Sequence, residues 1–428
     1  MEKRIYVLIA FMFSLLTQAQ GFIKVENGKL IKDGKPYHYV GTNFWYGMNL
    51  GVSDKERLIR ELDRLNVLGV KNLRIIAGSE GNINTPWAIQ PAMQKEPGVY
   101  NDDLWNGLDF LLAEMKNRDM KAVVCLNNFW HWSGGFVQYV SWANNNESIP
   151  YPPPAENGDW TIYQQYSARF YSDKTAKNFF ENHIKKVISR VNTINNLPYK
   201  EDRTIMAWQL ANEPVGSNNI EDYRKWIHET AKFIKSLDSN HLVSIGSEGN
   251  TRSAANGTNF ETDHQSQYID YCTFHLWVQN WGWFDPLKAK ETYSNAVEKA
   301  TSYIEEHVKI AQKINKPVVL EEFGISRDEN NYDPNSSIKI RDEYYKLIFE
   351  KIYSLSKTIP QVAGVNFWAW GGEGRPKSLM SLWKEGDDFI GDPPHEPQGW
   401  YSVYDTDFST QKIIKYYSLK MSNEQLNK

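Results

Sequence analysis

The chain has 428 residues and a formal net charge of −4 at pH 7. A single barrel domain with insertions can exceed about 400 residues, so this length fits one domain. The small negative charge and the absence of Lys/Arg blocks argue against a nucleic-acid-binding surface, and they favour a neutral substrate.

The first 20 residues have the pattern of a secretory signal. Basic residues at positions 3 and 4 precede an apolar run from Ile5 to Leu16, and small residues follow where a signal peptidase cleaves. The apolar run is about a dozen residues long, short of the ~20 that span a bilayer. We therefore predict a signal peptide over residues 1–20, a mature domain over 21–428 without a membrane span, and a secreted or periplasmic protein. A retained anchor is the alternative.

After the signal, strand-like runs at residues 22–25 and 29–32 flank Glu26-Asn27-Gly28 and predict short hairpins that plug the floor of a barrel. Strands and helices then alternate. The strands are predicted at residues 37–43, 72–76, 121–126, 204–210, 242–245, 271–276, 317–320 and 364–368. The helices are predicted at residues 54–68, 103–117, 174–191, 220–237, 289–314 and 337–355, the first behind a Ser53-x-x-Glu56 capping box.

This alternation implies a parallel sheet with right-handed crossovers, and eight units imply a closed barrel. The predicted fold is therefore α/β, a single (β/α)₈ TIM barrel with a short N-terminal hairpin and long active-site loops. One of these loops is a Trp-rich insertion at residues 130–160, and a Pro-containing stretch at 391–399 is predicted to be a rigid loop after the last strand. We interpret both as packed loops and not as domain boundaries.

The mature chain holds only two cysteines, Cys125 and Cys272, each inside a predicted strand. Two thiols give neither a disulfide framework nor the spacing of metal ligands. We predict that both are buried apolar fillers, because unpaired Cys is among the most buried residue types. A disulfide between strands is the alternative.

Two apolar, strand-like runs end in carboxylates: residues 208–214, with Glu213, and residues 317–324, with Glu321 and Glu322. They would form the fourth and seventh strands, whose carboxyl ends face one another across the barrel mouth, where such barrels keep their active sites. Two facing carboxylates are typical of glycoside hydrolysis. Carboxyls about 5–5.5 Å apart give retention of configuration, whereas about 6.5–9.5 Å gives inversion.

The combination of Trp208 to Pro214, Glu322-Phe323-Gly324, Arg74 and His275 resembles the signatures of glycoside hydrolase family 5, a retaining family. Further runs are similar to its endo-β-1,4-mannanase branch. These lie at residues 127–128, 134–142, 170–173, 190–193 and 199–208. The resemblance extends from about residue 22 to about residue 420, essentially the whole mature chain.

The resemblance implies that Glu213 is the general acid/base, which requires a raised pKa so that it can protonate the leaving oxygen. It implies that Glu322 is the nucleophile, because in the family pattern the acid directly precedes the aromatic-Gly pair. Strand alternation also predicts that only one of Glu321 and Glu322 enters the barrel mouth. The role of Glu321 stays open.

Other site residues follow from the same resemblance. Asn212 is expected to bind the 2-hydroxyl of the sugar in the −1 subsite, and Arg74 to hold the nucleophile ionised. His275 is expected beside the sugar or the nucleophile, and Trp368 under the −1 sugar. Stacking on sugar faces is expected from about half of the tryptophans in loops after strands, which are Trp130, Trp132, Trp142, Trp281 and Trp283.

Two positions depart from the family pattern. Trp277 stands where the family commonly has a Tyr that donates to the nucleophile; an indole can donate but cannot accept. Val215 stands where many mannanases carry an Arg that meets the sugar on the leaving-group side. This second departure puts strict endo action in doubt.

The resemblance therefore implies a secreted endo-β-1,4-mannanase that acts on mannan, glucomannan or galactomannan. It implies neither a cofactor nor a metal. An exo-acting β-mannosidase, which the insertion at 130–160 would favour, and a β-1,4-glucanase are alternatives within the family. A non-catalytic glycan-binding protein is an alternative of another class. The sequence does not predict an oligomeric state.

Overall fold

A computed structural model describes residues 21–251 and 256–422. The predicted signal peptide, residues 1–20, lies outside the described residues. Among those described, no helix combines the length and apolar character needed to cross a membrane.

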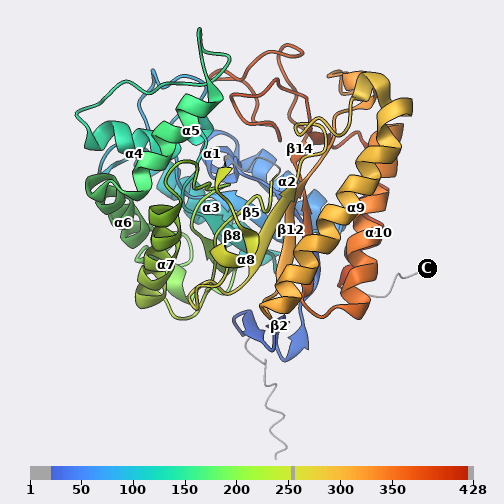
Figure 1. The fold of residues 1–428 in the computed structure, drawn as a ribbon, viewed down its shortest axis with the longest axis horizontal. Helices are drawn as coiled ribbons and strands as arrows, with labels where there is room; N and C mark the ends of the chain where they lie inside the picture. Colours follow the sequence, from blue (N-terminus) through green and yellow to red (C-terminus); the bar gives the residue numbers. More distant parts are fainter. Residues whose placement is uncertain (1–20, 252–255, 423–428) are drawn as a thin grey trace, which may run out of the picture.

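Eight parallel strands form the centre of the molecule, in the order β10-β9-β8-β5-β4-β13-β12-β11 (Figure 1). Between β10 and β11, the Asp270 N–H donates to the Val243 carbonyl at 2.8 Å, so the sheet is nearly closed. The predicted (β/α)₈ barrel is confirmed. The strands are β4 Tyr39–Asn43, β5 Asn72–Ile76, β8 Lys121–Cys125, β9 Ile205–Gln209, β10 Leu242–Ser244, β11 Cys272–Leu276, β12 Val318–Phe323 and β13 Val362–Phe367.

Helices surround the barrel and also occupy its loops (Figure 1). The outer helices are α1 Gly47–Ser53, α2 Lys55–Val67, α3 Asp102–Asn117, α6 Lys174–Ile188, α7 Ile220–Leu237, α9 Ala289–Lys313, α10 Lys339–Thr358 and α11 Phe408–Met421. The loop helices are α4 Gly135–Ala143, α5 Trp160–Ala168 and α8 Phe260–Asp263.

The capping box predicted for the first long helix is wrong. Ser53 ends α1, and its hydroxyl donates to the Asn49 carbonyl at 3.1 Å. The residue that caps α2 is Asp54, whose side chain accepts from the Arg57 N–H at 2.9 Å. The extra helix α1 shifts the N-cap by one residue, because the sequence signal did not separate two consecutive helices.

A three-stranded antiparallel sheet closes the floor of the barrel, as predicted (Figure 1). Its strands are β1 Lys24–Glu26, β2 Lys29–Lys32 and β3 Lys35–Pro36. Ile23 and Leu30 from this segment pack into one buried cluster with inward-facing side chains of the barrel, among them Val319 and Val123. Two further short pairs lie in the loops: β6 Gln94–Glu96 with β7 Val99–Tyr100, and β14 Trp370–Gly372 with β15 Val403–Tyr404.

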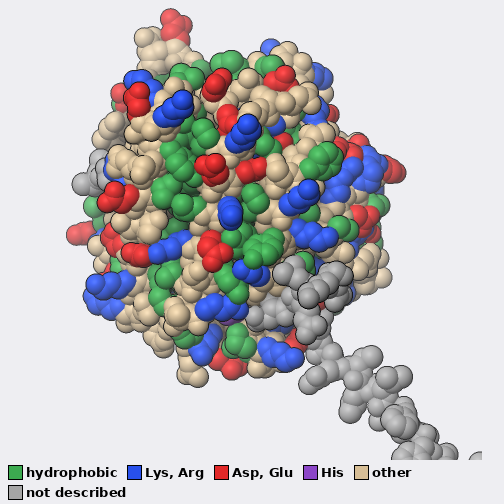
Figure 2. All heavy atoms as spheres, turned by 90° about the vertical axis from the view of Figure 1, so that its right-hand side faces the viewer, with side chains coloured by type: hydrophobic (Ala, Val, Ile, Leu, Met, Phe, Trp, Pro, Cys, Tyr) green, Lys and Arg blue, Asp and Glu red, His purple; other side chains and the backbone are tan. Residues whose placement is uncertain are grey.

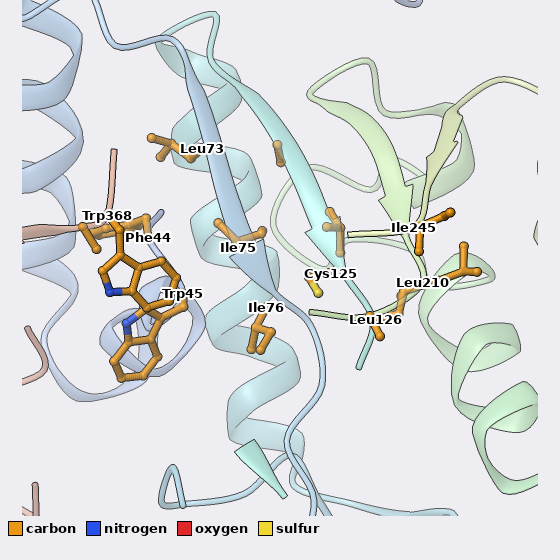
Figure 3. Close-up of a cluster of buried hydrophobic side chains, with 14 of the residues drawn as sticks. Phe44, Trp45, Leu73, Ile75, Ile76, Cys125, Leu126, Leu210, Ile245 and Trp368 are labelled. Carbon is orange, nitrogen blue, oxygen red and sulfur yellow. The ribbon is translucent and has the colours of Figure 1, made fainter. Parts of the chain in front are cut away.

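Alternation along β5 explains how a charged residue reaches the barrel interior. Leu73 and Ile75 join the large apolar cluster between the barrel and its helices (Figure 3). Arg74, between them, points to the opposite face and lies inside the barrel. Cys125 and Cys272 are buried and unpaired, so the prediction that they are fillers is confirmed.

The face of the molecule that carries α9 and α10 is shown in Figure 2. Acidic and basic side chains are interspersed there with small apolar areas. Such a mixed surface does not form a single-sign field on this face.

Candidate active site

A cavity of about 530 Å³ opens at the carboxyl ends of the barrel strands. Both predicted catalytic carboxylates line it. Its lining consists of Trp130, Trp132, Pro153, Trp160, Gln164, Asn212, Glu213, Glu248, Trp277, Asn280, Trp281, Glu322, Trp368, Pro393, His395, Glu396, Pro397 and Trp400.

The backbone at the end of β9 turns Glu213 into this cavity. The φ of Glu213 is 48°, in the left-handed region that residues other than glycine rarely adopt. Its N–H donates to the Gly246 carbonyl at 2.9 Å, and the Asn212 N–H donates to the Asn127 carbonyl at 2.9 Å. Two neighbouring loops therefore hold a strained turn in place, as is common at functional sites.

Three ring nitrogens surround the Glu213 carboxylate. His275 Nδ1 donates to Oε1 at 2.5 Å, and Trp130 Nε1 donates to Oε2 at 2.6 Å. Trp277 Nε1 donates to Oε1 at 3.3 Å. The indole at position 277 thus supports a carboxylate, but this carboxylate is Glu213 and not the expected nucleophile Glu322.

Glu322, on β12, lies opposite Glu213. Arg74 Nη1 donates to its Oε1, and His275 Nδ1 lies 3.2 Å from its Oε2. A carboxylate oxygen of Glu213, one of Glu322 and a ring nitrogen of His275 all lie within 4.8 Å of one another. The prediction that Arg74 contacts Glu322 is confirmed, and His275 bridges the two carboxylates.

Of the two neighbouring glutamates, only Glu322 lines the cavity at the barrel mouth, as predicted, but simple alternation does not explain this, because Glu321 also points into the barrel interior. The register between β11 and β12 shifts: Phe274 pairs with Leu320, but His275 pairs with Glu322, so Glu321 has no partner on β11. This is a β-bulge, which re-aims side chains. Alternation from the inward-facing Val319 would turn Glu321 inward and Glu322 outward. The bulge brings both inward.

The expectation that the pKa of Glu213 is raised is wrong. Burial alone raises the pKa of Glu213, but the His275 imidazolium and the Trp130 hydrogen bond outweigh burial and lower it. Burial and the charge of Glu213 raise the pKa of Glu322, although His275 and Arg74 oppose them. The pKa of His275 lies well above its ordinary value, because Glu322 and Glu213 overcome its burial. The proton nearest to both carboxylates therefore resides on His275.

The residues expected in the −1 subsite lie together. Arg74 Nη2 donates to the Asn212 Oδ1 at 2.8 Å, and Asn212 Nδ2 donates to the Asn128 side chain at 3.2 Å. Trp368 lines the cavity, and its ring meets that of Trp277 edge to face at 5.8 Å. The structure thus brings Asn212 and Trp368 to the cavity beside the carboxylate pair.

Within the described residues, one set of three side chains has ligand atoms close enough together to surround a cation. This set is Glu213, His275 and Glu322. His275 is protonated, and Arg74 already contacts Glu322. A metal ion would have to displace these positive charges, so the arrangement favours proton transfer over metal binding.

Comparison with known proteins decides the family. The model for proteins described as GH family 5 beta-mannosidase-like matches residues 20–426. The chain belongs to glycoside hydrolase family 5. It is therefore a glycoside hydrolase.

Relatives of this family 5 chain agree in sequence and in fold. A protein named mannan endo-1,4-beta-mannosidase 5 from Solanum lycopersicum is 33% identical over 368 residues, which cover 82% of this chain and 81% of that protein. The structure of the glycoside hydrolase family 5 mannosidase from Rhizomucor miehei is 39% identical, with a TM-score of 0.87 over 94% of this chain and 98% of that one. The endo-beta-1,4-mannanase from Thermotoga petrophila is 26% identical, with a TM-score of 0.68, covering 92% and 79%.

The loop tryptophans of this family 5 hydrolase divide into two groups. Trp130, Trp132 and Trp281 line the cavity, and stacking on sugar stays a prediction for these three. Trp142 packs against Tyr139 instead, and Trp283 packs edge to face against Trp281. The second departure from the family pattern, Val215, is buried and absent from the cavity lining.

Sequence reasoning missed several lining residues. Glu248 follows β10, and the rule that barrel strands end in functional groups could have found it. Burial and the nearby charge of Glu213 raise the pKa of Glu248 to about 8. No motif marked the others, because they lie in irregular loops: Asn280, His395, Glu396 and Trp400.

Proposed function

We propose that this family 5 chain hydrolyses β-1,4-mannosidic bonds with retention of configuration, with Glu322 as nucleophile and Glu213 as general acid/base. One observation carries the proposal: oxygens of the two carboxylates lie within 4.8 Å of each other beside a cavity. This spacing leaves no room for a water between the sugar and the second carboxylate, as inversion would need.

In the first step, a Glu322 oxygen attacks the anomeric carbon and the bond from that carbon to the glycosidic oxygen breaks. The leaving oxygen takes a proton from Glu213. The proton comes to Glu213 from His275, whose Nδ1 lies 2.5 Å from Oε1. Because the two groups titrate together, the proton belongs to the pair. Arg74 keeps Glu322 anionic for attack through its direct contact.

In the second step, Glu213 acts as base. It removes a proton from water, which attacks the anomeric carbon of the glycosyl-enzyme and releases Glu322. The His275 and indole hydrogen bonds stabilise the Glu213 carboxylate that this step needs. Asn212 is placed to hold the sugar 2-hydroxyl, a contact that strengthens in the transition state.

The substrate that we propose is β-mannan, including glucomannan and galactomannan. The name of the Solanum lycopersicum relative, a mannan endo-1,4-beta-mannosidase, supports internal cleavage. The likeness to the Thermotoga petrophila enzyme, an endo-beta-1,4-mannanase, supports it as well. The tryptophans that line the cavity fit a polysaccharide chain, because indole rings stack on the apolar faces of sugars.

A second candidate, exo-acting release of mannose, is favoured by the loops around the cavity. The insertion after β8 and the loop after β14 both contribute to the lining, through Pro153 and Pro393. These two loops meet where the rings of His131 and His395 lie 5.2 Å apart, edge to face. We infer that this contact closes one side of the cavity. Val215 also offers no charged contact to a leaving sugar.

Product analysis tests both candidates. The protein is incubated separately with linear mannan, glucomannan and cellulose, and early products are separated by chromatography and mass. Mixed mannooligosaccharides support endo action, whereas mannose alone supports exo action. Cello-oligosaccharides as the main product would contradict the mannan assignment, and no product from any polymer would contradict the proposed activity.

Two variants test the catalytic roles. Glu213→Gln and Glu322→Gln should each abolish most activity while the thermal unfolding curve stays near that of the wild type. Full activity in either variant would overturn the assignment. We also propose that residues 1–20 direct export, which N-terminal sequencing of the protein outside the cytoplasm tests.

A further inference from the structure

Glu321 is a buried carboxylate that the proposed mechanism does not use. Its side chain is fully buried and does not line the cavity, so it does not touch substrate. Alternation along β12 turns it inward, and the bulge brings Glu322 to the same side, so that both carboxylates contact Arg74 and His275. Burying a charge is unfavourable unless specific partners compensate it, so its partners indicate what it does.

Three side chains hold Glu321. Gln209 Nε2 donates to both carboxylate oxygens, at 3.0 and 2.8 Å. Arg74 Nε lies 3.5 Å from Oε2 and also donates to the Gln209 Oε1 at 2.8 Å. His275 Nε2 lies 3.8 Å from Oε2. Arg74 and His275 therefore each contact both carboxylates, with Glu321 on one side and Glu322 on the other.

The charge of Glu321 has a definite effect on His275. The two ring nitrogens of His275 face in opposite directions, with Nδ1 toward Glu213 and Glu322 and Nε2 toward Glu321. A proton shared between His275 and Glu213 can rest on the imidazole only if the imidazolium is stabilised, and an anion behind Nε2 does so. Arg74 and His275 in turn lower the pKa of Glu321 despite its burial, so Glu321 is ionised.

We propose that Glu321 is a positioning residue for the reaction, whose carboxylate orients Arg74 through Gln209 and sets where the proton shared by His275 and Glu213 resides. This inference rests on the proposed function. Without Glu321, His275 would release its proton at lower pH, and the pair could no longer supply a proton to the leaving oxygen in alkaline solution.

Other ionisable groups around Glu321 and His275 do not replace this charge. Tyr39, Cys125 and Tyr271 lie near Glu321, and burial raises the pKa of each, so they stay neutral. Glu248 lies on the other side of Glu213, and its raised pKa of about 8 keeps it uncharged at neutral pH. Among the described residues, Glu321 is thus the ionised group on the Nε2 side of His275.

The test is the Glu321→Gln variant, which keeps the shape and, through its amide oxygen, one of the two hydrogen bonds from Gln209, but removes the charge. The kcat/KM profile is measured from acid to alkaline pH with an aryl β-mannoside. We expect the alkaline limb to move toward acid by about one pH unit, the lower end of what an opposite charge within ~4–6 Å contributes. The NMR titration of the His275 ring, assigned by comparison with His275→Gln, should move in the same direction.

Glu321→Asp is the conservative companion. It keeps the charge but withdraws it by one methylene, so both shifts should have the same sign and smaller size, and it serves where the Gln variant does not fold. Asp109→Asn is the matched control: it neutralises another buried carboxylate, which binds Arg190 and Tyr199, and should leave both pH profiles unchanged.

An unchanged His275 titration in Glu321→Gln overturns the inference, as does a loss of kcat/KM that is uniform across pH, since a purely structural role would produce the latter. If the wild type cleaves no β-mannoside, the proposed function fails. The His275 titration then still decides whether Glu321 controls the proton.

Discussion

The hydrogen bond from Trp130 to Glu213 offers a direct test of how the site controls its acid/base. Trp130 Nε1 donates to the Glu213 Oε2 at 2.6 Å, inside a buried pocket, and the ring lies nearly parallel to Tyr163 with 6.1 Å between centroids. Trp130→Phe removes the donor and keeps an aromatic ring. The change therefore acts on the carboxylate more than on packing.

The size of the effect follows from the chemistry of the bond. A hydrogen bond to a charged group contributes about 1.5–3 kcal/mol. Since about 1.4 kcal/mol is tenfold in an equilibrium, the ionised form of Glu213 should lose roughly 10- to 150-fold relative to the protonated form. Trp277 Nε1 donates to the same carboxylate at 3.3 Å, beyond the usual range for strong bonds. Trp277→Phe should have a smaller effect of the same sign.

The sign is opposite to that expected for Glu321→Gln. The Trp130 N–H stabilises the carboxylate and lowers the pKa of Glu213, so its loss raises that pKa and Glu213 holds its proton to higher pH. The alkaline limb of kcat/KM should move toward alkaline pH. The assay is the pH dependence of kcat/KM for the wild type, Trp130→Phe and Trp277→Phe on one aryl β-mannoside. A limb in Trp130→Phe that is unchanged, or that moves toward acid, would refute the reasoning.

Two further predictions concern the scaffold. Asp109 accepts two hydrogen bonds from Arg190 and one from Tyr199, so Asp109→Asn should lower the free energy of unfolding by about 3 kcal/mol at pH 7, measured by urea denaturation. Its partners lower the pKa of Asp109, so the stability it contributes is present above the ordinary Asp pKa and is lost as pH falls through the folded value. The difference in the free energy of unfolding between Asp109→Asn and the wild type should therefore shrink in acid. A difference that stays constant with pH would contradict this prediction. Cys125 and Cys272 should resist Ellman's reagent in the native protein and react after unfolding, because both are buried and burial raises each pKa to about 12; rapid native labelling would contradict this.

The fold could be predicted from the sequence because most strands are short apolar runs followed by a long amphipathic helix. The strand predicted at residues 72–76 matches β5 in full, and the helix predicted at 220–237 matches α7. The hydrophobic periodicity of the sequence is enough to predict such elements. It did not find α1, whose residues 47–53 hold two glycines and no clear apolar stripe, and this omission displaced the predicted cap.

The residues of the site also divide into those that the sequence could predict and those that it could not. The carboxylates lie at or just after strand ends, where strand prediction located them, whereas Arg74 and Asn212 were predicted from the resemblance to family 5. That Glu321 and Glu322 both point inward could not be predicted, because a bulge adds one residue to a strand and leaves no mark on an apolar pattern. The loop residues His395 and Glu396 reach the cavity only through the path of a loop far along the chain, which local sequence does not encode.

The indoles and Glu321 have opposite effects on the proton that His275 and Glu213 share. The two steps of retaining hydrolysis need both effects. The first step requires the proton on Glu213 and the second requires Glu213 to be free of it. The indoles of Trp130 and Trp277 favour the carboxylate, while the anion of Glu321 keeps the released proton close by, on His275. A site with the indoles alone would lose the proton to solvent as pH rises. A site with Glu321 alone would hold the proton but would stabilise the basic form of Glu213 less. Alternation turns Glu321 inward and the bulge in β12 turns Glu322 inward beside it, so the anion lies next to the catalytic pair without lining the cavity that receives the sugar.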